Sequence, residues 1–301
     1  MKIEKYAAID IGSNAIRTLI ANIVTNENGS VFISKNALLR APIRLGEDTF
    51  TSGNISNHNI KRMLRAMKAF KLLIKVHSVV DYNVYATSAL REANNRLHVV
   101  ELIKKKTGIE IEMINGKKEA KLISSLDLFQ GINKQSNFLF VDVGGGSTEF
   151  SILQNGDRVI EKSFKIGTVR LLNNMVSDLL WDEVKKWIVD KTKDLDKLSI
   201  LGTGGNINKI HRITQTKEGK PITSKTLRHI YKKMSLLTYN ERIINYQLNP
   251  DRADVILPAL QIYLRAMQWS NTSKIHVQKI GLTDGMIEEL YMSRKNLILN
   301  I

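Results

Sequence analysis

An internal repeat constrains the fold of this chain more than any other feature. The segment "YAAIDIGSNAIRTLIA" (residues 6–21) has the same plan as "FLFVDVGGGSTEFSIL" (138–153): apolar strand, Asp-x-Gly, small polar turn, second strand. Asp142 aligns with Asp10, which sets the offset of the repeat at a little under half of the 301-residue chain. A repeat of this length indicates two duplicated domains that face each other, because the repeats of solenoid proteins are much shorter.

Strand-like and helix-like segments alternate along the chain, which predicts an α/β fold. In the first half we expect strands at 6–12, 16–24, 81–87 and 109–115, and helices at 60–75, 96–106 and 116–129. The pattern then restarts. We therefore predict an N-terminal domain at residues 1–125 and a second domain at 126–301.

The composition is that of an ordinary globular protein, with 43% hydrophobic residues, enough for two cores. Cysteine is absent, which excludes disulfides and thiol chemistry. The N-terminus has no long apolar leader, and no apolar stretch approaches the length needed to span a membrane. We therefore expect a cytoplasmic protein with no membrane partner.

The formal net charge is +16, and a strongly basic surface attracts polyanions. Aromatic residues make up only 6% of the chain, which leaves little material for stacking bases. Zinc-finger spacing and RNP-like runs are also absent from the sequence. Nucleic-acid binding is therefore not supported beyond the charge itself.

Three glycine-rich turns point to phosphate binding. They are Gly12-Ser13-Asn14, Gly144-Gly145-Gly146-Ser147 and Gly202-Thr203-Gly204-Gly205. Bare backbone N–H groups in such turns approach anions closely. A tight hairpin explains any one turn equally well, but three together favour phosphate. The motifs GxxxxGK[ST] and GxGxxG are absent from these turns, so neither a P-loop nor a Rossmann site is expected.

Asp10 and Asp142 stand at the strand ends beside two of these turns. A carboxylate can approach phosphate oxygens through a hard divalent cation such as Mg²⁺, which prefers carboxylates, water and phosphate. Each aspartate alone could simply cap its own turn. The matched pair favours the cation.

Seven ordered blocks together resemble the exopolyphosphatase / guanosine pentaphosphate phosphohydrolase (Ppx/GppA phosphatase) family. They are "AAIDIGSNAIRTLI", "VYATSALREANN", "INGKKEAKLI", "FVDVGGGSTEFSI", "SFKIGTVRLL", "LGTGGNINKI" and "NPDRADVILPAL". The resemblance covers nearly the whole chain. It implies the actin-like ATPase superfold, with two ribonuclease-H-like domains and an active site in the cleft between them.

The resemblance also implies an activity: metal-dependent hydrolysis of a terminal phosphoanhydride, in inorganic polyphosphate or at the 5′ end of pppGpp. Glu119 matches the family's catalytic glutamate, which orients or deprotonates the attacking water. Glu149 matches a residue near the metal and the water, and Arg91 matches a phosphate-contacting arginine. Asp10 and Asp142 match the metal-associated aspartates, with Mg²⁺ or another hard divalent cation expected as cofactor.

The resemblance implies a set of phosphate- and substrate-binding residues, drawn from the glycine turns and from cleft-lining blocks. They are Gly12, Ser13, Asn14, Arg17, Gly144, Gly145, Gly146, Ser147, Gly167, Gly204 and Arg252. Lys165 and Arg170 fall in the same "KIGTVRL" block, where a structural ion pair is an equal alternative. In the repeat, Arg17 and Glu149 occupy equivalent positions, each the same distance along the chain after its aspartate.

The sequence also lacks the residue patterns of several other catalytic mechanisms. No Ser-His-Asp or Cys-His arrangement is apparent, and the six histidines show no metal-ligand spacing. We therefore expect direct attack by water, without a covalent intermediate. The chain stops at Ile301 and has no His-Asp dipeptide, so the extra HD-like domain of longer relatives is expected to be absent. The block "GLTDGMIEEL" also departs from the family's common "LREG".

Several functions stay open at this point. Polyphosphate and pppGpp present the same terminal anhydride, so the motifs do not separate them, whereas the basic charge favours polyphosphate. A small-molecule kinase of the actin superfold and a non-enzymatic nucleotide sensor are the alternatives from other classes. Dimers are common in the family, so a homodimer is a further expectation.

Overall fold

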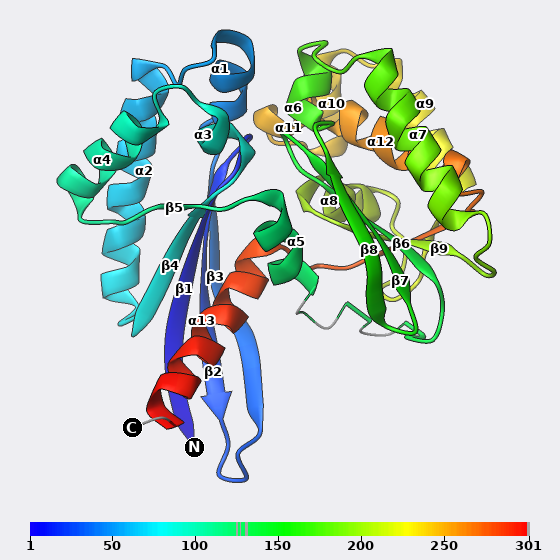
Figure 1. Ribbon diagram of the computed structural model, residues 1–301. Helices are drawn as coiled ribbons and strands as arrows, with labels where there is room; N and C mark the ends of the chain where they lie inside the picture. Colours follow the sequence, from blue (N-terminus) through cyan, green and yellow to red (C-terminus); the bar gives the residue numbers. More distant parts are fainter. Residues whose placement is uncertain (125, 127, 130–131, 300–301) are drawn as a thin grey trace. The chain divides into compact units, whose positions relative to one another are not determined.

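The computed structural model describes residues 1–124, 126, 128–129 and 132–299. The chain divides into two compact units, which we describe separately. Unit 1 is Met1–Leu126 with Gly281–Ile301, and unit 2 is Asp127–Ile280. Figure 1 labels most of the elements of both units along the chain.

Unit 1 is built on a five-stranded mixed sheet in the order β3-β2-β1-β4-β5. The strands are β1 (Lys2–Ile11), β2 (Ile16–Thr25), β3 (Val31–Ala41), β4 (Asp81–Ala86) and β5 (Glu112–Met113). The pairs β1–β2 and β2–β3 are antiparallel, while β4 runs parallel to both β1 and β5. The carboxyl end of β1 is thus next to the carboxyl end of β4.

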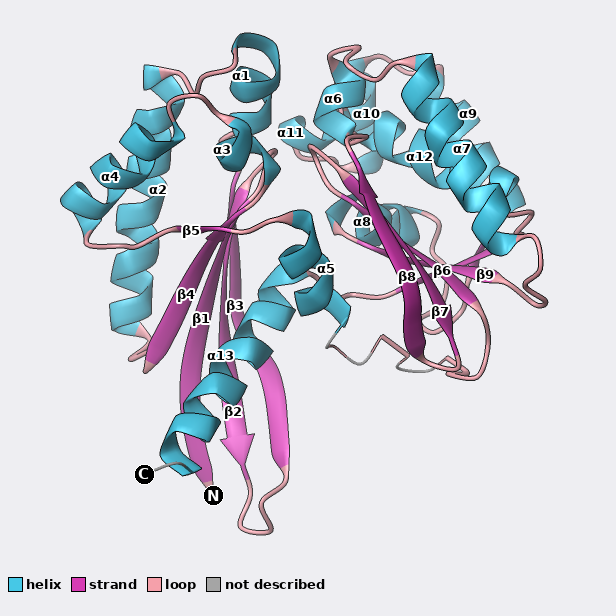
Figure 2. Cartoon of the chain, viewed as in Figure 1, coloured by secondary structure: helices cyan, strands magenta, loops and turns pink. Residues whose placement is uncertain are grey.

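In the described part of unit 1, six helices accompany this sheet. They are α1 (Leu45–Ser52), α2 (Asn57–Val76), α3 (Ser88–Glu92), α4 (Arg96–Thr107), α5 (Gly116–Ser124) and α13 (Leu282–Leu299). The Ser56 side chain caps α2 by accepting from the Asn59 N–H, and the apolar face of α2 follows the helical period. Helix α13 packs along β1, β2 and β4, as Figure 2 shows.

Unit 2 repeats the plan on a six-stranded sheet in the order β10-β11-β9-β6-β7-β8. The strands are β6 (Phe138–Val143), β7 (Thr148–Gln154), β8 (Asp157–Phe164), β9 (Ser199–Thr203), β10 (Ile222–Thr223) and β11 (Lys274–Val277). A register irregularity follows Ile20 in the β2–β3 pair and Ile152 in the β7–β8 pair. These two positions are separated by the same offset as the two aspartates, so the duplication extends to a local defect of the ladder.

Among the residues of unit 2 that the structure describes, seven helices are present. They are α6 (Thr168–Leu172), α7 (Asp178–Thr192), α8 (Gly205–Ile213), α9 (Ser224–Ser235), α10 (Tyr239–Tyr246), α11 (Pro250–Ala253) and α12 (Ile256–Trp269). Their apolar faces join one face of the sheet in a single core cluster. Phe150, Phe164 and Trp187 pack ring to ring within it, with centroids 5.9–6.3 Å apart.

The α/β class and the duplicated domain plan are confirmed. The strand observed within the predicted range 109–115 is the shorter β5. It is short because only Tyr85 and Ala86 of β4 pair with it. The helix predicted at 116–129 is observed as α5, and its positions 125 and 127 lie outside the described residues. In the part of the chain that the structure describes, no helix is both long and apolar enough to cross a membrane.

The prediction that residues 126–301 form the second domain is wrong at its C-terminal end. The chain returns at Gly281 to unit 1, where α13 completes the core. Leu282, Met286 and Ile287 of α13 lie in one buried cluster with Tyr6 and Leu19 of the sheet. The apolar pattern of α13 predicts a buried helix face, but it does not say which of two similar sheets that face covers.

Replacing Met286 by alanine should test this assignment. Met286 is fully buried, so Met286→Ala is expected to lower the free energy of unfolding by about 2–5 kcal/mol. Met292 is the matched control on the same helix, because its side chain is 48% exposed. Met292→Ala should change stability by about 0.5 kcal/mol or less in the same urea titration. Equal effects of the two substitutions would contradict the packing of α13 on unit 1.

Candidate functional site

The first two glycine turns are closed by the same backbone hydrogen bond. In unit 1 the Gly12 N–H donates to the Ala15 carbonyl at 3.2 Å. In unit 2 the Gly144 N–H donates to the Ser147 carbonyl at 3.0 Å. Ala15 and Ser147 are again separated by the offset of the repeat, so the turns are equivalent in structure as well as in sequence.

The unit 1 turn packs against the start of α1. The Gly46 N–H donates to the Ser13 carbonyl at 2.8 Å, and the Arg44 N–H donates to the Asn14 carbonyl at 3.1 Å. A Cβ on Gly46 would lie only 2.9 Å from the Ser13 Cβ, so this close approach requires glycine. Arg44 adopts a left-handed conformation (φ 64°) and its Nε donates to Glu47 at 2.8 Å. Sequence reasoning missed this segment, and the only signal was a lone glycine.

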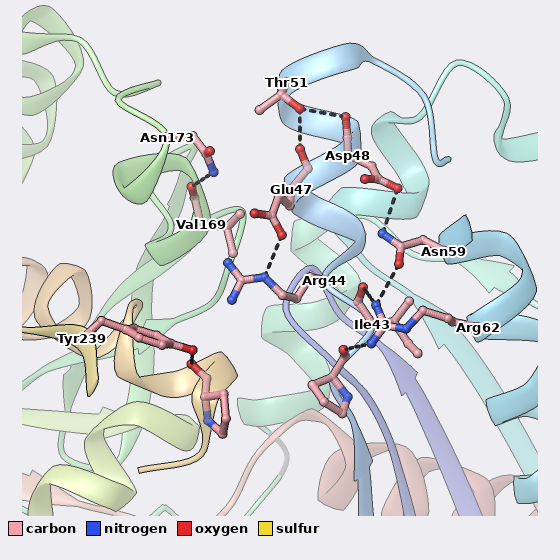
Figure 3. A network of polar contacts seen from close by, with 12 residues as sticks. Ile43, Arg44, Glu47, Asp48, Thr51, Asn59, Arg62, Val169, Asn173 and Tyr239 are labelled. Carbon is pink, nitrogen blue, oxygen red and sulfur yellow. Dashed lines mark hydrogen bonds and ion pairs between the residues drawn. The ribbon is translucent and has the colours of Figure 1, made fainter. Parts of the chain in front are cut away.

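Side chains of α2 hold the same segment in place, as Figure 3 shows. The Arg62 guanidinium donates to the carbonyls of Pro42 (2.7 Å) and Ile43 (3.1 Å). The Asn59 amide donates to the Asp48 carboxylate at 2.9 Å. The unit 1 turn therefore packs against the start of α1, which is stabilised by polar contacts with α2.

Asp10 and Arg17 are direct partners in the β1–β2 register. The Arg17 guanidinium donates to the Asp10 carboxylate at 3.1 Å, with the aspartate side chain 5% exposed and the arginine 37% exposed. The structure thus pairs a predicted metal ligand with a predicted phosphate contact. Asp142 lies opposite Glu149 in the equivalent β6–β7 register, so unit 2 has two carboxylates where unit 1 has an ion pair.

Glu149 is buried and held by two hydroxyl groups. Its Oε1 accepts from the Ser147 hydroxyl at 2.7 Å and from the Ser163 hydroxyl at 2.9 Å, and the residue is 3% exposed. Two carboxylates directly opposite each other on neighbouring strands destabilise a sheet. A bound cation would remove that penalty, which makes this pair the best candidate for a metal site.

The third turn adjoins the same carboxylates. Thr203 is the partner of Asp142 in the β6–β9 register, and its carbonyl accepts from the Tyr263 hydroxyl at 2.7 Å. Gly204 has φ 103°, and a Cβ there would lie 3.1 Å from the Asp142 Oδ1. Burial and the nearby Asp142 charge hold the pKa of Tyr263 well above its usual value, so this tyrosine stays neutral. Arg252 donates to the Gly205 carbonyl at 2.6 Å.

The second turn is held by the start of α6. The N–H groups of Thr168 and Val169 donate to the carbonyls of Gly144 (3.0 Å) and Gly145 (2.9 Å). A Cβ on Gly167 would overlap the Gly145 carbonyl oxygen, at a separation that real Cβ atoms do not reach. Gly167, which the sequence predicts to bind substrate, thus packs directly against the Gly144–Ser147 turn.

Arg170 and Lys165, from the same block, lie in different environments. The Arg170 side chain is 8% exposed, and its Nε donates to the Gly146 carbonyl at 2.7 Å. Arg170 thus braces the turn from within the protein. Lys165 is exposed.

Glu119 lies in the first turn of α5 and is half-buried. Asn115 begins the helix: its side chain accepts from the Lys118 N–H at 2.8 Å, and its carbonyl accepts from the Glu119 N–H at 3.0 Å. The Arg91 guanidinium donates to the Ile114 carbonyl at 2.5 Å. Arg91 therefore anchors the connection between β5 and α5, just before the predicted catalytic glutamate.

Arg158 is a site neighbour that sequence reasoning missed. Its guanidinium donates to the Ser151 hydroxyl and to Glu161 (3.2 Å), and it lies 5.2 Å from the centre of the Phe140 ring. Burial lowers the pKa of Arg158, while the charges of Glu161 and Asp142 act in the opposite direction. Asp142 therefore has a partly buried cation near it. The sequence alignment of the repeat ends at residue 153, before Arg158, so it gave no signal for this contact.

Among the described residues, no group of three or more His, Cys, Asp or Glu side chains is arranged to hold a metal ion. Mg²⁺ does not need such a cage, because it is commonly bound by one or two carboxylates with water and substrate phosphates. Asp142 and Glu149 fit that donor set. Asp10 is held by Arg17 and fits it less well.

Comparisons with known proteins identify relatives of this chain. A Fusobacterium nucleatum protein named bifunctional 3-dehydroquinate synthase/phosphatase is 29% identical over 85% of this chain and 43% of its own length. The guanosine-5'-triphosphate,3'-diphosphate pyrophosphatase of Aliivibrio fischeri is 26% identical over 95% of this chain and 60% of its length. The chain thus spans less than two thirds of these relatives. An exopolyphosphatase structure from Cytophaga hutchinsonii covers 94% of this chain and 96% of its own with a TM-score of 0.77 at 22% identity, which shows the fold.

The match to a protein family is broader than any single relative. Residues 23–293 match the Ppx/GppA phosphatase family, a span that includes Glu119, Asp142, Glu149 and the second and third glycine turns. The fold comparison agrees with this match across both units. The chain belongs to the Ppx/GppA phosphatase family.

Proposed function

We propose that this chain hydrolyses the terminal phosphoanhydride of inorganic polyphosphate and releases orthophosphate by direct attack of water. One observation carries the proposal. Asp142 and Glu149 lie opposite each other, with Gly204 packed against the Asp142 carboxylate and the Gly144–Ser147 turn between the two strands. Carboxylates beside a phosphate-binding turn supply positioning and charge neutralisation, which phosphoryl transfer chiefly requires.

The glycine turns would bind the phosphates. In unit 2, Gly145, Gly146 and Ser147 would present backbone N–H groups, while the turn carbonyls are engaged by α6 and Arg170. Ser13 and Asn14 would serve the same purpose in unit 1. Arg17 would move from Asp10 to a substrate phosphate, because a guanidinium pairs with phosphate oxygens as well as with a carboxylate.

Asp142 and Glu149 would hold a hard divalent cation, for which Mg²⁺ is our proposal. Such an ion offsets negative charge on phosphoryl oxygens in the transition state. The Ser147 and Ser163 hydroxyls would hold the Glu149 carboxylate in place for this role.

Glu119 would orient the attacking water and accept its proton. Its place in the first turn of α5 suits this role, because the helix dipole stabilises a carboxylate there. Arg91 would contribute by holding the start of α5 through the Ile114 carbonyl.

A cluster of cations in unit 2 favours a long polyanion as substrate. Burial lowers the pKa of Lys209, and the neighbouring charges of Arg212 and Arg252 lower it further. Crowded cations of this kind are stabilised when an anion binds. With the net charge of +16, this favours polyphosphate. The alternative is pppGpp, on which the Aliivibrio fischeri relative acts according to its name.

The test is to measure orthophosphate release from polyphosphate and from pppGpp, with Mg²⁺ and with EDTA. We expect a higher kcat/KM for polyphosphate, with activity lost in EDTA and restored by Mg²⁺. A higher kcat/KM for pppGpp would select the alternative substrate. Activity that persists in EDTA would remove the metal assignment of Asp142 and Glu149, and no release from either substrate would overturn the proposal.

A further inference from the structure

Helices α5 and α13 touch backbone to backbone. Gly285 of α13 faces Leu122 of α5, and a Cβ on Gly285 would overlap the Leu122 carbonyl oxygen and lie 2.6 Å from its carbon. Leu122 is buried in one cluster with Leu282 and Met286 of α13. Because backbone atoms cannot move aside as a flexible side chain can, any residue larger than glycine at 285 must displace one helix from the other.

A chain of polar contacts joins the same two helices through β4. The Tyr85 hydroxyl donates to the Glu289 carboxylate of α13 at 2.5 Å. The Lys118 ammonium of α5 donates to the Tyr85 hydroxyl at 3.1 Å and to Glu112 at 2.8 Å, and it lies 4.3 Å from the Tyr85 ring centre. The residue directly before Glu119 is therefore tied to β4, to β5 and, through Tyr85, to α13.

These contacts lie beside Asp10, near the end of β1. Tyr85 is the partner of Asp10 in the parallel β1–β4 register, so both side chains are on the sheet face that α13 covers. Gly285 and Glu289 are one helical turn apart and therefore share a face of α13. One face of α13 thus makes both the steric contact with α5 and the hydrogen-bonded connection to it.

We propose that α13 is a positioning element for Glu119. Gly285 sets the distance between α13 and α5, and the Glu289–Tyr85–Lys118 chain sets the rotation of α5, so that the Glu119 carboxylate is held at its working position. Gly285, Glu289, Tyr85 and Lys118 are positioning residues and do not touch the substrate. The inference rests on the role given to Glu119 in the proposed function.

The first test is Gly285→Ala. Displacing α5 by about 1 Å is expected to lower kcat for polyphosphate roughly 10- to 100-fold, with KM nearly unchanged, because misplacement of a catalytic group acts on the chemical step. Gly281→Ala is the matched control at the start of the same helix, where an added Cβ would meet no heavy atom within 4 Å. That control should keep the kcat and the melting temperature of the parent chain.

The second test breaks the polar chain without changing its volume. Tyr85→Phe removes the hydroxyl that joins Lys118 and Glu289 and is expected to lower kcat several-fold at constant KM. Glu289→Gln keeps an acceptor for that hydroxyl and should retain most of the activity, whereas Glu289→Leu should resemble Tyr85→Phe. A purely structural role would instead lower the melting temperature without separating kcat from KM.

A double-mutant cycle with Glu119→Gln decides the proposal. If Gly285 acts through Glu119, Gly285→Ala should cause no further loss of the residual turnover of Glu119→Gln. The same fold-loss in both backgrounds would overturn the inference, as would a kcat within twofold of the parent for Gly285→Ala. If Gly285→Ala does not fold, the Tyr85→Phe cycle is read in the same way. Full activity of Glu119→Gln alone would instead overturn the proposed role of Glu119, a result that is distinct from these.

Discussion

Glu119→Gln is expected to lower kcat for polyphosphate hydrolysis by about 10²- to 10⁴-fold, the usual contribution of a general base. Glutamine keeps the shape of the side chain and its place in the first turn of α5. It cannot accept the proton of the attacking water, so the loss should fall on kcat and leave KM nearly constant. Initial rates of orthophosphate release over a range of polyphosphate concentrations measure both constants.

The matched control for this charge change is Glu101→Gln, because Glu101 is exposed on α4. It should leave both kinetic constants unchanged. The free energy of unfolding of Glu119→Gln should stay within about 1 kcal/mol of the parent, since a first-turn acid adds only that much to a helix. A kcat within tenfold of the parent for Glu119→Gln would contradict the assignment.

Gly167→Ala should reduce kcat/KM by about 10²-fold, because it displaces groups that must be placed to within an ångström. The added Cβ would overlap the Gly145 carbonyl oxygen and lie 2.6 Å from the Gly146 carbonyl carbon. The turn or the start of α6 must therefore shift. We also expect a loss of stability of about 1–3 kcal/mol, as in other overpacked sites.

Both expected effects of Gly167→Ala, on kcat/KM and on stability, are compared with those of a control substitution. Gly281→Ala adds the same methyl group where nothing lies within 4 Å, and it should change neither kcat/KM nor the urea midpoint. A folded Gly167→Ala protein with the parent's kcat/KM would show that the turn does not position the substrate.

The repeat made much of the fold predictable from the sequence. A single offset aligned Asp10 with Asp142, and the structure adds matching turn closures and a matching irregularity of the ladder at that same offset. The strand register of a duplicated strand–turn–strand unit is set locally. The alternation of buried and exposed side chains, together with the turn, fixes which residues of the two strands pair. Arg17 and Glu149 accordingly occupy equivalent positions, and the structure shows each of them opposite its aspartate.

Other features depend on contacts that local sequence does not encode. Helix α13 packs on the sheet of unit 1. Its own sequence does not specify which of the two similar sheets it covers. The ion pair of Asp10 with Arg17 forms across two strands and has no equivalent in unit 2, where Glu149 lies opposite Asp142. Arg158 reaches the neighbourhood of Asp142 from the edge strand β8, beyond the aligned segment of the repeat. Gly46 and Gly167 support the turns from segments far along the chain.

The most direct test of the central claim is hydrolysis of polyphosphate in H₂¹⁸O with Mg²⁺, followed by mass spectrometry of the released orthophosphate. Attack of water on the terminal phosphorus predicts one ¹⁸O atom in each orthophosphate released, and no release by Glu119→Gln above a small residual rate. Absence of orthophosphate, or release without ¹⁸O, would contradict the account.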